Sequence, residues 1–420
     1  MTQMIRVPAG TPFAPVALSA RRPKVFLYSH DTFGLGHLRR NLAIATALLD
    51  DPAPFQVTLL TGSPVIDAWR LPRGLHVQPL PPVVKTGAEA YAALAPGACF
   101  PLVKGYREAL ILKLVLRQRP DILLVDHAPA GMNGELLATL GLIRRELPAT
   151  RTVLGLRDIL DSPESVAEIW RAQDIHALLD HAYDDILVYG SRRLFDVAES
   201  YGLSAKSAAK LRYTGYVVGR PASPAGSPCW NQARAAQRPV VLVTAGGGGD
   251  GYALMEAYLA ALTALPPGAV YSAILTGPLM APDQAVRLRA AAIRRSDIEL
   301  IERTTDLLPS LAAADAVVAM AGYNTSAELI ACGARALLVP RAAPSAEQRM
   351  RAALLDRLGL AVHVPPGEGL ASRLAAALPA LLAAPRPGAS GAALLDLNGA
   401  ARVRGFLAER TTRLLAGYAA

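Results

Sequence analysis

Residues 316–340 combine a helix start with polar side chains that could bind an anionic ligand. An apolar run ends in a glycine turn, and a helix follows with Asn324 or Thr325 as its N-cap. The free N–H groups and the positive end of such a helix favour a phosphate. Glu328 lies one turn into this helix, and Gln348 follows the next apolar run. We therefore expect both side chains at the carboxyl edge of a parallel sheet, where open α/β folds bind ligands.

Glu328 also has a purely structural explanation. The segment from Thr325 to Glu328 matches a T-x-x-E capping box, in which the carboxylate accepts a hydrogen bond from a backbone N–H at the helix start. A carboxylate can instead accept hydrogens from two hydroxyl groups, such as those of a ribose. The neighbouring Gly322 and Gln348 favour the ribose contact, and the capping box stays open as the alternative.

A second glycine-rich segment, residues 246–251, formally matches G-x-G-x-x-G. Its glycines would let the backbone approach a phosphate closely. A dinucleotide site would also need an acidic residue near the end of the next strand, which reads Leu275-Thr276-Gly277. The pattern therefore favours a loop that faces a diphosphate over an NAD site, with a structural tight turn as the alternative.

In the N-terminal half, Gly34-Leu35-Gly36-His37 places a histidine at the start of a predicted helix. The positive end of a helix favours the neutral imidazole, which suits a general base near pH 7. Asp126 and Asp158 each follow a predicted strand, so either carboxylate could orient His37 or act as the base. The alternatives are a capping role for His37 or Asp158 and an ion pair between Arg157 and an aspartate. Arg39 and Arg40 are either solvated or in contact with an anionic acceptor.

Strands alternate with helices along the whole chain, which predicts doubly wound parallel sheets. The expected strands are residues 24–29, 56–60, 76–80, 122–125, 152–156 and 186–189, then 240–244, 271–275, 299–301, 316–319, 336–339 and 361–364. The expected helices are 37–49, 102–118, 134–146, 163–181 and 191–201, then helices from 252 and 324, 283–295, 347–358, 370–383 and a helix from 394.

The pattern restarts after a stretch rich in Pro, Ser, Gly and Ala, which indicates two domains. We expect a flexible tail over 1–22, a Rossmann-like domain over 23–217 and a linker over 218–238. A second Rossmann-like domain is expected over 239–393, and a C-terminal helix over 394–420 could pack back on the first domain. The cleft between the two carboxyl edges would hold the substrates.

Composition narrows the class of protein. The 420 residues contain three widely spaced cysteines, which suggest neither a disulfide framework nor a zinc site and fit a reducing cytoplasm. No D-x-D motif or His/Cys cluster predicts a metal site. No apolar run of membrane-spanning length occurs, and the first twenty residues lack a signal-peptide pattern. The net charge of +9 permits anionic partners, although aromatic residues do not interleave with the cations as nucleic-acid binding would require.

Residues 102–119 mix apolar residues with cations. This pattern favours a core-facing helix with a basic solvent side, and contact with an anionic membrane surface is the alternative.

Together these motifs resemble the GT-B glycosyltransferases, in particular the branch that includes the lipid-linked N-acetylglucosamine transferase of peptidoglycan synthesis. The resemblance covers nearly the whole chain and is most specific at Gly34-x-Gly36-His37 and at Ala321-Gly322-x-Asn324-Thr325-x-x-Glu328, with Gly333, Pro340 and Glu347-Gln348. The opening segment, residues 28–40, looks like a loosely characterised group of bacterial predicted glycosyltransferases.

The resemblance implies a role for each matched position. Glu328 would bind the ribose hydroxyls, Gln348 the hydroxyls of the donor sugar, and Arg303 and Thr304 would face the base through backbone groups. The implied donor site comprises Gly246, Gly247, Gly248, Gly249, Arg303, Thr304, Gly322, Tyr323, Asn324, Thr325, Glu328, Glu347 and Gln348. The implied acceptor site comprises Gly34, Gly36, Arg40 and Arg157, and the catalytic candidates are His37, Asp126 and Asp158. Glu347 departs from the paired glutamines of the peptidoglycan enzyme, which leaves the donor sugar open.

The predicted function is the transfer of a sugar from a nucleoside diphosphate sugar, UDP-linked by resemblance, to a hydroxyl acceptor. We expect inversion at the anomeric carbon, no metal ion and no cofactor, because helix N-termini can stabilise the departing diphosphate. A UDP-sugar hydrolase or an epimerase is the alternative on the same fold, and a non-catalytic nucleotide-sugar binding protein is a third possibility. We expect a cytoplasmic location, with peripheral contact at the inner membrane surface as a further possibility.

Overall fold

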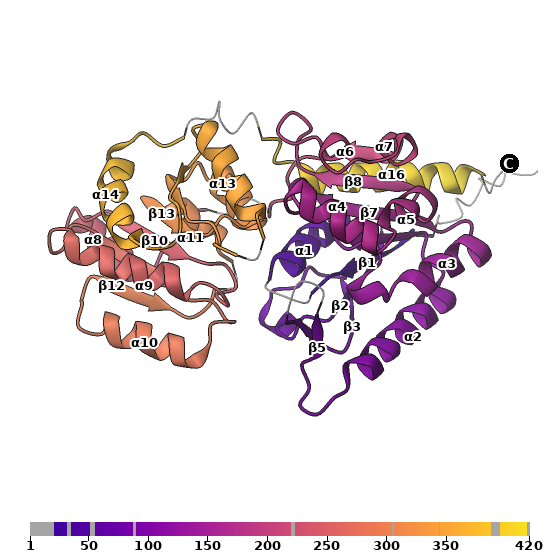
Figure 1. Ribbon diagram of the computed structural model, residues 1–420, viewed down its shortest axis with the longest axis horizontal. Helices are drawn as coiled ribbons and strands as arrows, with labels where there is room; N and C mark the ends of the chain where they lie inside the picture. Colours follow the sequence, from indigo (N-terminus) through magenta and orange to yellow (C-terminus); the bar gives the residue numbers. More distant parts are fainter. Residues whose placement is uncertain are drawn as a thin grey trace, which may run out of the picture.

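The computed structural model describes residues 21–31, 35–50, 55–86, 90–219, 223–304, 306–343, 345–387 and 395–417. The described chain forms two α/β domains side by side, joined near residue 217, with a long C-terminal helix lying along the first domain (Figure 1). Two of the sequence predictions, the tail up to residue 20 and Gly34, lie outside the described residues.

The first domain is built on a parallel sheet of seven strands in the order β3-β2-β1-β6-β7-β8-β9. Its strands are β1 (Lys24–Ser29), β2 (Gln56–Thr61), β3 (His76–Pro79), β6 (Ile122–Asp126), β7 (Arg151–Arg157), β8 (Asp185–Tyr189) and β9 (Leu211–Tyr213). Every residue of β6 and β8 is buried, as expected for central strands that are covered on both faces. Because β1 pairs with β6, the loops that follow these two strands emerge side by side.

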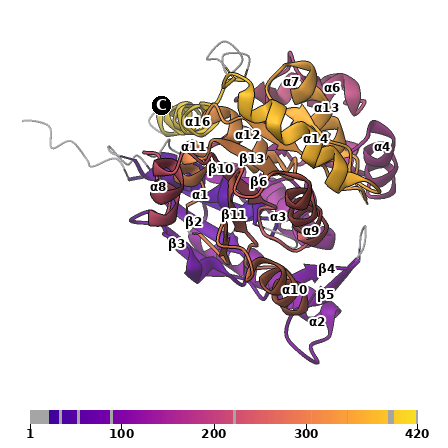
Figure 2. The ribbon, with the colours of Figure 1, turned by 90° about the vertical axis from the view of Figure 1, so that its left-hand side faces the viewer.

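Helices cover both faces of this sheet. They are α1 (Gly36–Leu49), α2 (Phe100–Gln118), α3 (Leu137–Glu146), α4 (Pro163–Ala172), α5 (Ile175–His181), α6 (Val197–Ser200) and α7 (Ala205–Lys210). Alternate residues of β1 point to opposite faces of the sheet. Val25 and Leu27 pack with α1, whereas Phe26 and Tyr28 pack with α2 and α3. An antiparallel hairpin, β4 (Val83–Lys85) and β5 (Tyr91–Ala93), lies beside the start of α2 (Figure 2), where the rings of Tyr91 and Phe100 stack.

The second domain has a six-stranded parallel sheet in the order β12-β11-β10-β13-β14-β15. Its strands are β10 (Val240–Thr244), β11 (Tyr271–Leu275), β12 (Ile298–Ile301), β13 (Ala316–Ala319), β14 (Ala336–Leu338) and β15 (Val362–His363). The helices are α8 (Pro228–Ala235), α9 (Tyr252–Ala261), α10 (Pro282–Ala292), α11 (Leu308–Ala313), α12 (Tyr323–Ala331), α13 (Glu347–Arg357) and α14 (Leu370–Ala383).

The C-terminal helix α16 (Gly399–Gly417) returns to the first domain. Before it starts, the Tyr216 N–H donates to the Asp396 carbonyl oxygen at 2.6 Å, and the Gly399 N–H donates to the Tyr216 carbonyl oxygen at 3.0 Å. Further along, Arg410 Nη2 donates to Asp185 Oδ1 at 2.6 Å. The chain therefore passes between the domains twice at neighbouring positions.

Several predicted elements differ from the structure. The helix expected over 163–181 is two helices, because Asp174 adopts a left-handed backbone with φ of 50°. The helix expected over 191–201 is reduced to α6, since the Asp196 carboxylate caps a helix that starts only at Val197. The linker expected over 218–238 contains α8, whose Trp230 is buried.

The predicted N-cap of α12 is also wrong. The helix begins at Tyr323, and Gly322 occupies the N-cap position, so Asn324 and Thr325 lie inside the first turn. Among the described residues, no helix is long and apolar enough to cross a membrane.

Candidate functional site

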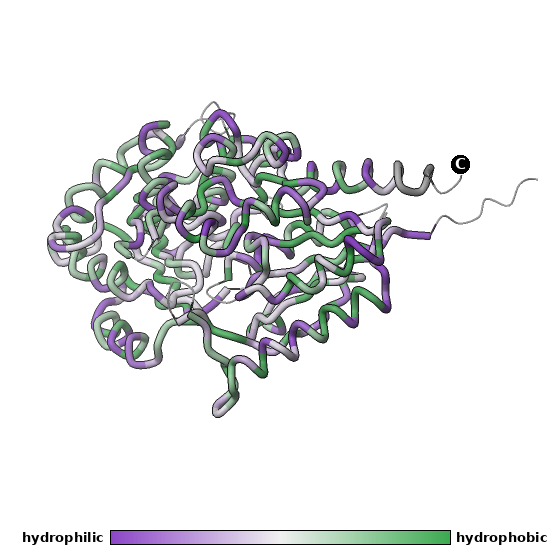
Figure 3. Tube along the Cα trace, turned by 45° about the vertical axis from the view of Figure 1, so that its right-hand side comes forward, coloured by the Kyte–Doolittle hydropathy of each residue, from purple (hydrophilic) through white to green (hydrophobic). Residues whose placement is uncertain are grey.

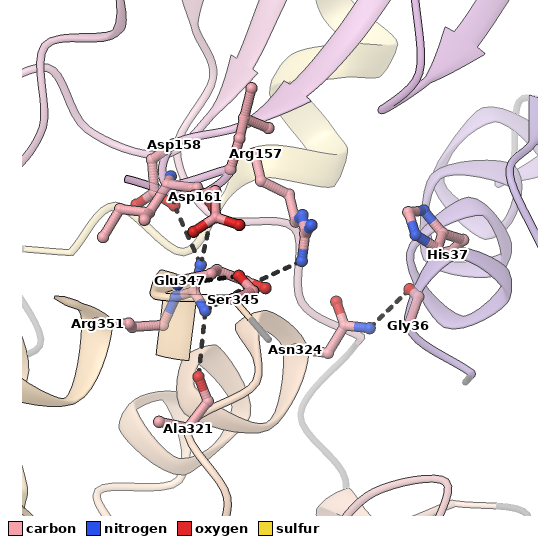
Figure 4. A network of polar contacts seen from close by, with 12 residues as sticks. Gly36, His37, Arg157, Asp158, Asp161, Ala321, Asn324, Ser345, Glu347 and Arg351 are labelled. Atoms are coloured by element: carbon pink, nitrogen blue, oxygen red, sulfur yellow. Dashed lines mark hydrogen bonds and ion pairs between the residues drawn. The ribbon is translucent and has the colours of Figure 1, made fainter. Parts of the chain in front are cut away.

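The starts of α1 and α12 meet at the junction of the two domains. The side chain of Asn324 donates from Nδ2 to the carbonyl oxygen of Gly36 at 2.7 Å (Figure 4). A Cβ atom on Gly36 would lie 3.5 Å from this Nδ2 atom, an ordinary contact distance, so the two helix starts are in direct contact. Within the described residues, neither helix start is capped by a side chain. Two helix N-termini thus point their N–H groups toward one region, which favours an anionic ligand there.

His37 is held by a buried carboxylate. Its Nδ1 atom lies 2.6 Å from Asp126 Oδ2, and Asp126 Oδ1 accepts from Nε and Nη2 of Arg40 at 2.8 and 2.7 Å. Burial by itself would raise the pKa of the Asp126 carboxyl, but the charges and hydrogen bonds of Arg40 and His37 outweigh burial and lower this pKa to about 2. Asp126 is therefore ionised near pH 7.

This geometry assigns the tautomer of His37. Because an ionised carboxylate can only accept hydrogen bonds, the proton of the neutral ring lies on Nδ1. Arg40 Nη2 is 3.1 Å from the same nitrogen, but the shorter contact to the carboxylate decides the assignment. Nε2 then carries the lone pair that a general base requires.

Two further histidines surround His37. The ring centroid of His127 lies 5.0 Å from that of His37, and the centroid of His30 lies 5.5 Å from it. Burial and the neighbouring Arg157 lower the pKa of His127 well below its usual range, so this ring is neutral. His30 is absent from the predicted site residues, although its position directly after β1 could have indicated it.

Asp158 takes a different position from Asp126. Its Oδ2 atom accepts from the hydroxyl of Tyr216 at 2.5 Å, and Oδ1 accepts from the backbone N–H of Ile159 at 2.8 Å. Tyr216 and Ile159 both belong to segments that hold the two domains together. The structure thus brings Asp126, and not Asp158, into contact with His37.

Glu328 lies in the second turn of α12 and is 6% exposed. Both of its carboxylate oxygens contact Nη2 of Arg39, which reaches across from α1 of the first domain. Burial raises the pKa of the Glu328 carboxyl, and Arg39 offsets part of this rise. The capping-box interpretation does not describe this contact, because the partner of the carboxylate is a guanidinium and Thr325 is not the N-cap.

Glu347, at the start of α13, forms a second bridge between the domains (Figure 4). Its Oε1 atom accepts from Arg157 Nη1 and from Arg351 Nη1, each at 2.7 Å. Burial would raise the pKa of the Glu347 carboxyl, but the two arginines outweigh it and lower this pKa. The backbone N–H of Ala346 donates to Asp161 Oδ1 at 2.8 Å, which fixes the start of α13 against the first domain. Arg157, predicted on the acceptor side, is thus a partner of a predicted donor residue.

Gln348 and the glycine-rich loop belong to one connected group. Gln348 Oε1 accepts from the backbone N–H of Arg341 at 3.0 Å, and the Arg341 side chain donates to Asp250 Oδ2 at 2.6 Å. A Cβ atom on Gly246 would lie 3.9 Å from Thr325 Oγ1, so the loop borders the start of α12. The predicted donor residues Gly246, Gly247, Gly248, Gly249, Gly322, Tyr323, Asn324, Thr325 and Gln348 therefore gather at the carboxyl edge of the second sheet.

The glycines of this loop also have structural roles. Gly248 has φ of 90°, and a Cβ atom there would collide with the carbonyl oxygen of Thr276. The Leu279 N–H donates to the Gly247 carbonyl oxygen at 2.8 Å. Arg303 and Thr304 follow β12 at the same edge and are exposed. The same glycines can therefore form a tight turn and leave the loop facing a ligand.

Comparisons with solved structures place this arrangement among known folds. The glycotransferase of kitacinnamycin superposes with a TM-score of 0.63 at 17% identity, covering 93% of this chain and 100% of that one. MurG of Acinetobacter baumannii gives a TM-score of 0.55 at 15% identity over 92% of this chain and 99% of its own. UGT89C1 of Arabidopsis thaliana, complexed with UDP, gives a TM-score of 0.60 at 14% identity over 92% of this chain and 94% of its own. The chain has the GT-B fold.

The GT-B assignment confirms the predicted fold class. Curated relatives with detectable sequence similarity carry the name UDP-N-acetylglucosamine--N-acetylmuramyl-(pentapeptide) pyrophosphoryl-undecaprenol N-acetylglucosamine transferase. The protein of Methylorubrum extorquens (strain PA1) is 31% identical over 217 residues, which are 50% of this chain and 58% of that protein. The protein of Sorangium cellulosum (strain So ce56) is 35% identical over 139 residues, 30% of this chain and 34% of its own length. The predicted resemblance to this branch is confirmed.

The matches are partial. The chain spans little more than half of the Methylorubrum extorquens relative, 58% of its length. No family model matches the chain. Within the GT-B fold, His37 belongs to the first domain and Glu328 to the second, so the candidate site lies where the domains meet.

Proposed function

We propose that this protein transfers a sugar from a nucleoside diphosphate sugar, UDP-linked, to a hydroxyl group of an acceptor, with inversion at the anomeric carbon. The observation that carries the proposal is the contact between the two helix starts. His37, held by Asp126, follows Gly36, whose carbonyl oxygen accepts a hydrogen bond from Asn324 at the start of α12. A base and an anion-binding helix start thus adjoin one another.

In the proposed reaction, Nε2 of His37 takes the proton of the acceptor hydroxyl while its oxygen attacks the anomeric carbon. Asp126 keeps the ring in the required tautomer and stabilises the imidazolium that forms. The bond between the anomeric carbon and the diphosphate oxygen breaks, and the nucleoside diphosphate leaves with the bonding electrons. The N–H groups at the start of α12 stabilise the negative charge that develops on it.

We propose that this electrostatic stabilisation replaces a metal ion and that no cofactor takes part. Glu328 would bind the ribose hydroxyls, and Gln348 would bind hydroxyls of the sugar, close to the glycine-rich loop. Within the described residues, no group of three His, Cys, Asp or Glu side chains could hold a metal ion. Activity that persists in excess EDTA would support the proposal, and activity restored only by a divalent cation would contradict it.

The deciding experiment incubates the purified protein with UDP-, GDP- and TDP-sugars and a cell extract as the source of acceptors. We expect a glycosylated product from a UDP-sugar, and we expect His37→Ala to abolish it. His76→Ala, at an exposed position of β3, is the matched control and should retain activity. Sugar release from the donor alone, at a rate unaffected by acceptors, would indicate a hydrolase instead.

We further propose that the outer face of α2 rests on an anionic membrane, which would place the protein at the inner surface of the cytoplasmic membrane. The buried side chains of α2, Arg107, Ile111 and Val115, share one face of the helix. The helix mixes apolar and polar positions along its length (Figure 3), and its other faces leave Leu102 75% and Tyr106 62% exposed. Lys113 on the same helix is exposed, so a cation accompanies the exposed apolar side chains.

A further inference from the structure

Arg39 and Glu328 form an ion pair between the two domains. Arg39 lies in the first turn of α1, two residues after His37, and Glu328 lies on α12. Their side chains are 14% and 8% exposed, so the pair is largely shielded from water. Shielding strengthens the attraction between two charges, because the effective dielectric constant falls.

We propose that Arg39 occupies the carboxylate of Glu328 in competition with the ribose of the nucleotide sugar, so that donor binding has to separate this ion pair. The inference rests on the proposed function, since it assumes that a ribose binds Glu328. It assigns Arg39 as a positioning residue that sets the affinity for the donor. Neither the sequence resemblance nor the proposed reaction gives Arg39 this role.

The competition follows from the atoms involved. A ribose diol bound by a carboxylate uses both carboxylate oxygens, and in the structure both oxygens of Glu328 contact the same Nη2 atom of Arg39. The free energy of the ion pair must therefore be subtracted from that of ribose binding. A nucleotide that binds only after the pair opens has its apparent affinity reduced by the fraction of molecules in which the pair is open.

The position of Arg39 links this exchange to the proposed base. Arg39 is on the first turn of the helix that carries His37, and Asn324 fixes the start of the same helix at Gly36. Separation of Arg39 from Glu328 removes one contact between α1 and α12, while the hydrogen bond from Asn324 to Gly36 and the Arg40 guanidinium over the Tyr323 ring stay in place. Binding of the donor at Glu328 thereby changes the contacts of α1, the helix that positions His37.

The test measures the affinity for UDP by isothermal titration calorimetry, for the wild type and for variants of Arg39. We expect Arg39→Ala to bind UDP at least about fivefold more tightly than the wild type, a change at the lower end of usual coupling effects. Arg39→Lys keeps the charge and should lie close to the wild type. The double variant with Glu328→Gln should lose the gain.

Asp161→Asn is the matched control, because it weakens a hydrogen bond between the domains without touching Glu328. It should bind UDP as the wild type does. If Arg39→Ala does not fold, as circular dichroism would reveal, Arg39→Gln carries the same test with a smaller loss of volume. Affinity that is unchanged or weaker in folded Arg39→Ala or Arg39→Gln overturns the proposal, because a residue that binds the nucleotide directly gives a loss. If the wild type binds none of the nucleotides, the proposed function itself fails.

Discussion

Asp126 Oδ2 lies 2.6 Å from Nδ1 of His37, and the carboxylate that makes this contact is 1% exposed. The pair joins the end of β6 to the first turn of α1, and Arg40 braces the carboxylate from the same helix. A histidine fixed in this way presents one defined nitrogen to a substrate. This relationship gives the proposed reaction its base.

Replacement of Asp126 by asparagine should lower kcat by about 10² to 10⁴-fold, because the amide can hold the ring in the wrong tautomer and cannot stabilise an imidazolium. The affinity for UDP should stay within about twofold of the wild type, since the described partners of the Asp126 carboxylate, His37 and Arg40, both belong to α1. Steady-state kinetics and calorimetry separate the two effects. An equal loss of kcat and UDP affinity would show that Asp126 supports the fold of the site rather than the base.

The ionised form of Asp126 should stabilise the fold in a defined pH window. Its pKa in the folded protein, about 2, lies below the ordinary value of 3.8, so the stabilisation is present above about pH 4 and is lost as the pH falls toward 2. A shift of this size corresponds to about 2 kcal/mol. Urea unfolding at pH 6 and pH 3 measures the free energy of unfolding of the wild type and of Asp126→Asn. The difference between the two proteins should be smaller at pH 3. A difference that grows on acidification would contradict this assignment.

Glu328→Gln should weaken UDP binding by about 10-fold or more, because the ribose hydroxyls lose a charged hydrogen-bond acceptor. Thermal unfolding should change little in comparison, since the glutamine keeps the volume and can still accept from Arg39. Glu302→Gln is the control: this glutamate follows β12 in the same domain, and its side chain is 73% exposed. UDP binding that survives in Glu328→Gln would exclude the ribose contact.

Removal of the Glu347 carboxylate should destabilise the protein, because Arg157 and Arg351 would then be left close together in a buried site. We expect Glu347→Ala to lower the free energy of unfolding by about 3 kcal/mol, as for other broken buried ion pairs. Arg192→Ala removes an exposed ion pair within one domain and should change the free energy of unfolding by less than about 0.5 kcal/mol. Denaturant unfolding gives the free energy of unfolding of both variants. Equally small losses in the two would mean that Glu347 does not hold the domains together.

The proposed membrane face can be tested with vesicles that contain anionic phospholipid. Leu102→Ser combined with Tyr106→Ser should reduce sedimentation with these vesicles by about 10-fold or more, since two exposed apolar side chains are lost. Val286→Ser combined with Ile293→Ser is the control, because these side chains in and just after α10 are also exposed, at 61% and 78%. Equal losses in both double variants, or none in either, would reject α2 as the contact face.

Local sequence patterns determined most of the elements that carry the site. The apolar runs of β1, β10 and β13 were predicted within one residue, because buried parallel strands are continuous apolar segments that glycine and proline terminate. Breaks that depend on a single backbone angle were missed, such as the left-handed Asp174 between α4 and α5. The hairpin of β4 and β5 was also missed, since its strands are only three residues long.

Tertiary structure decided which of the predicted residues act together. Asp126 and Asp158 were equal candidates in the sequence, since each follows a buried strand. The sheet order separates them: β6 pairs directly with β1, so Asp126 emerges beside the helix that carries His37, whereas β7 lies one strand further away. The pairs Arg39–Glu328 and Arg157–Glu347 join residues 289 and 190 positions apart, and only the packing of the two domains brings their charges together. Residue types and local spacing determine which groups can do chemistry, and the order of the strands and the domain junction determine which of them meet.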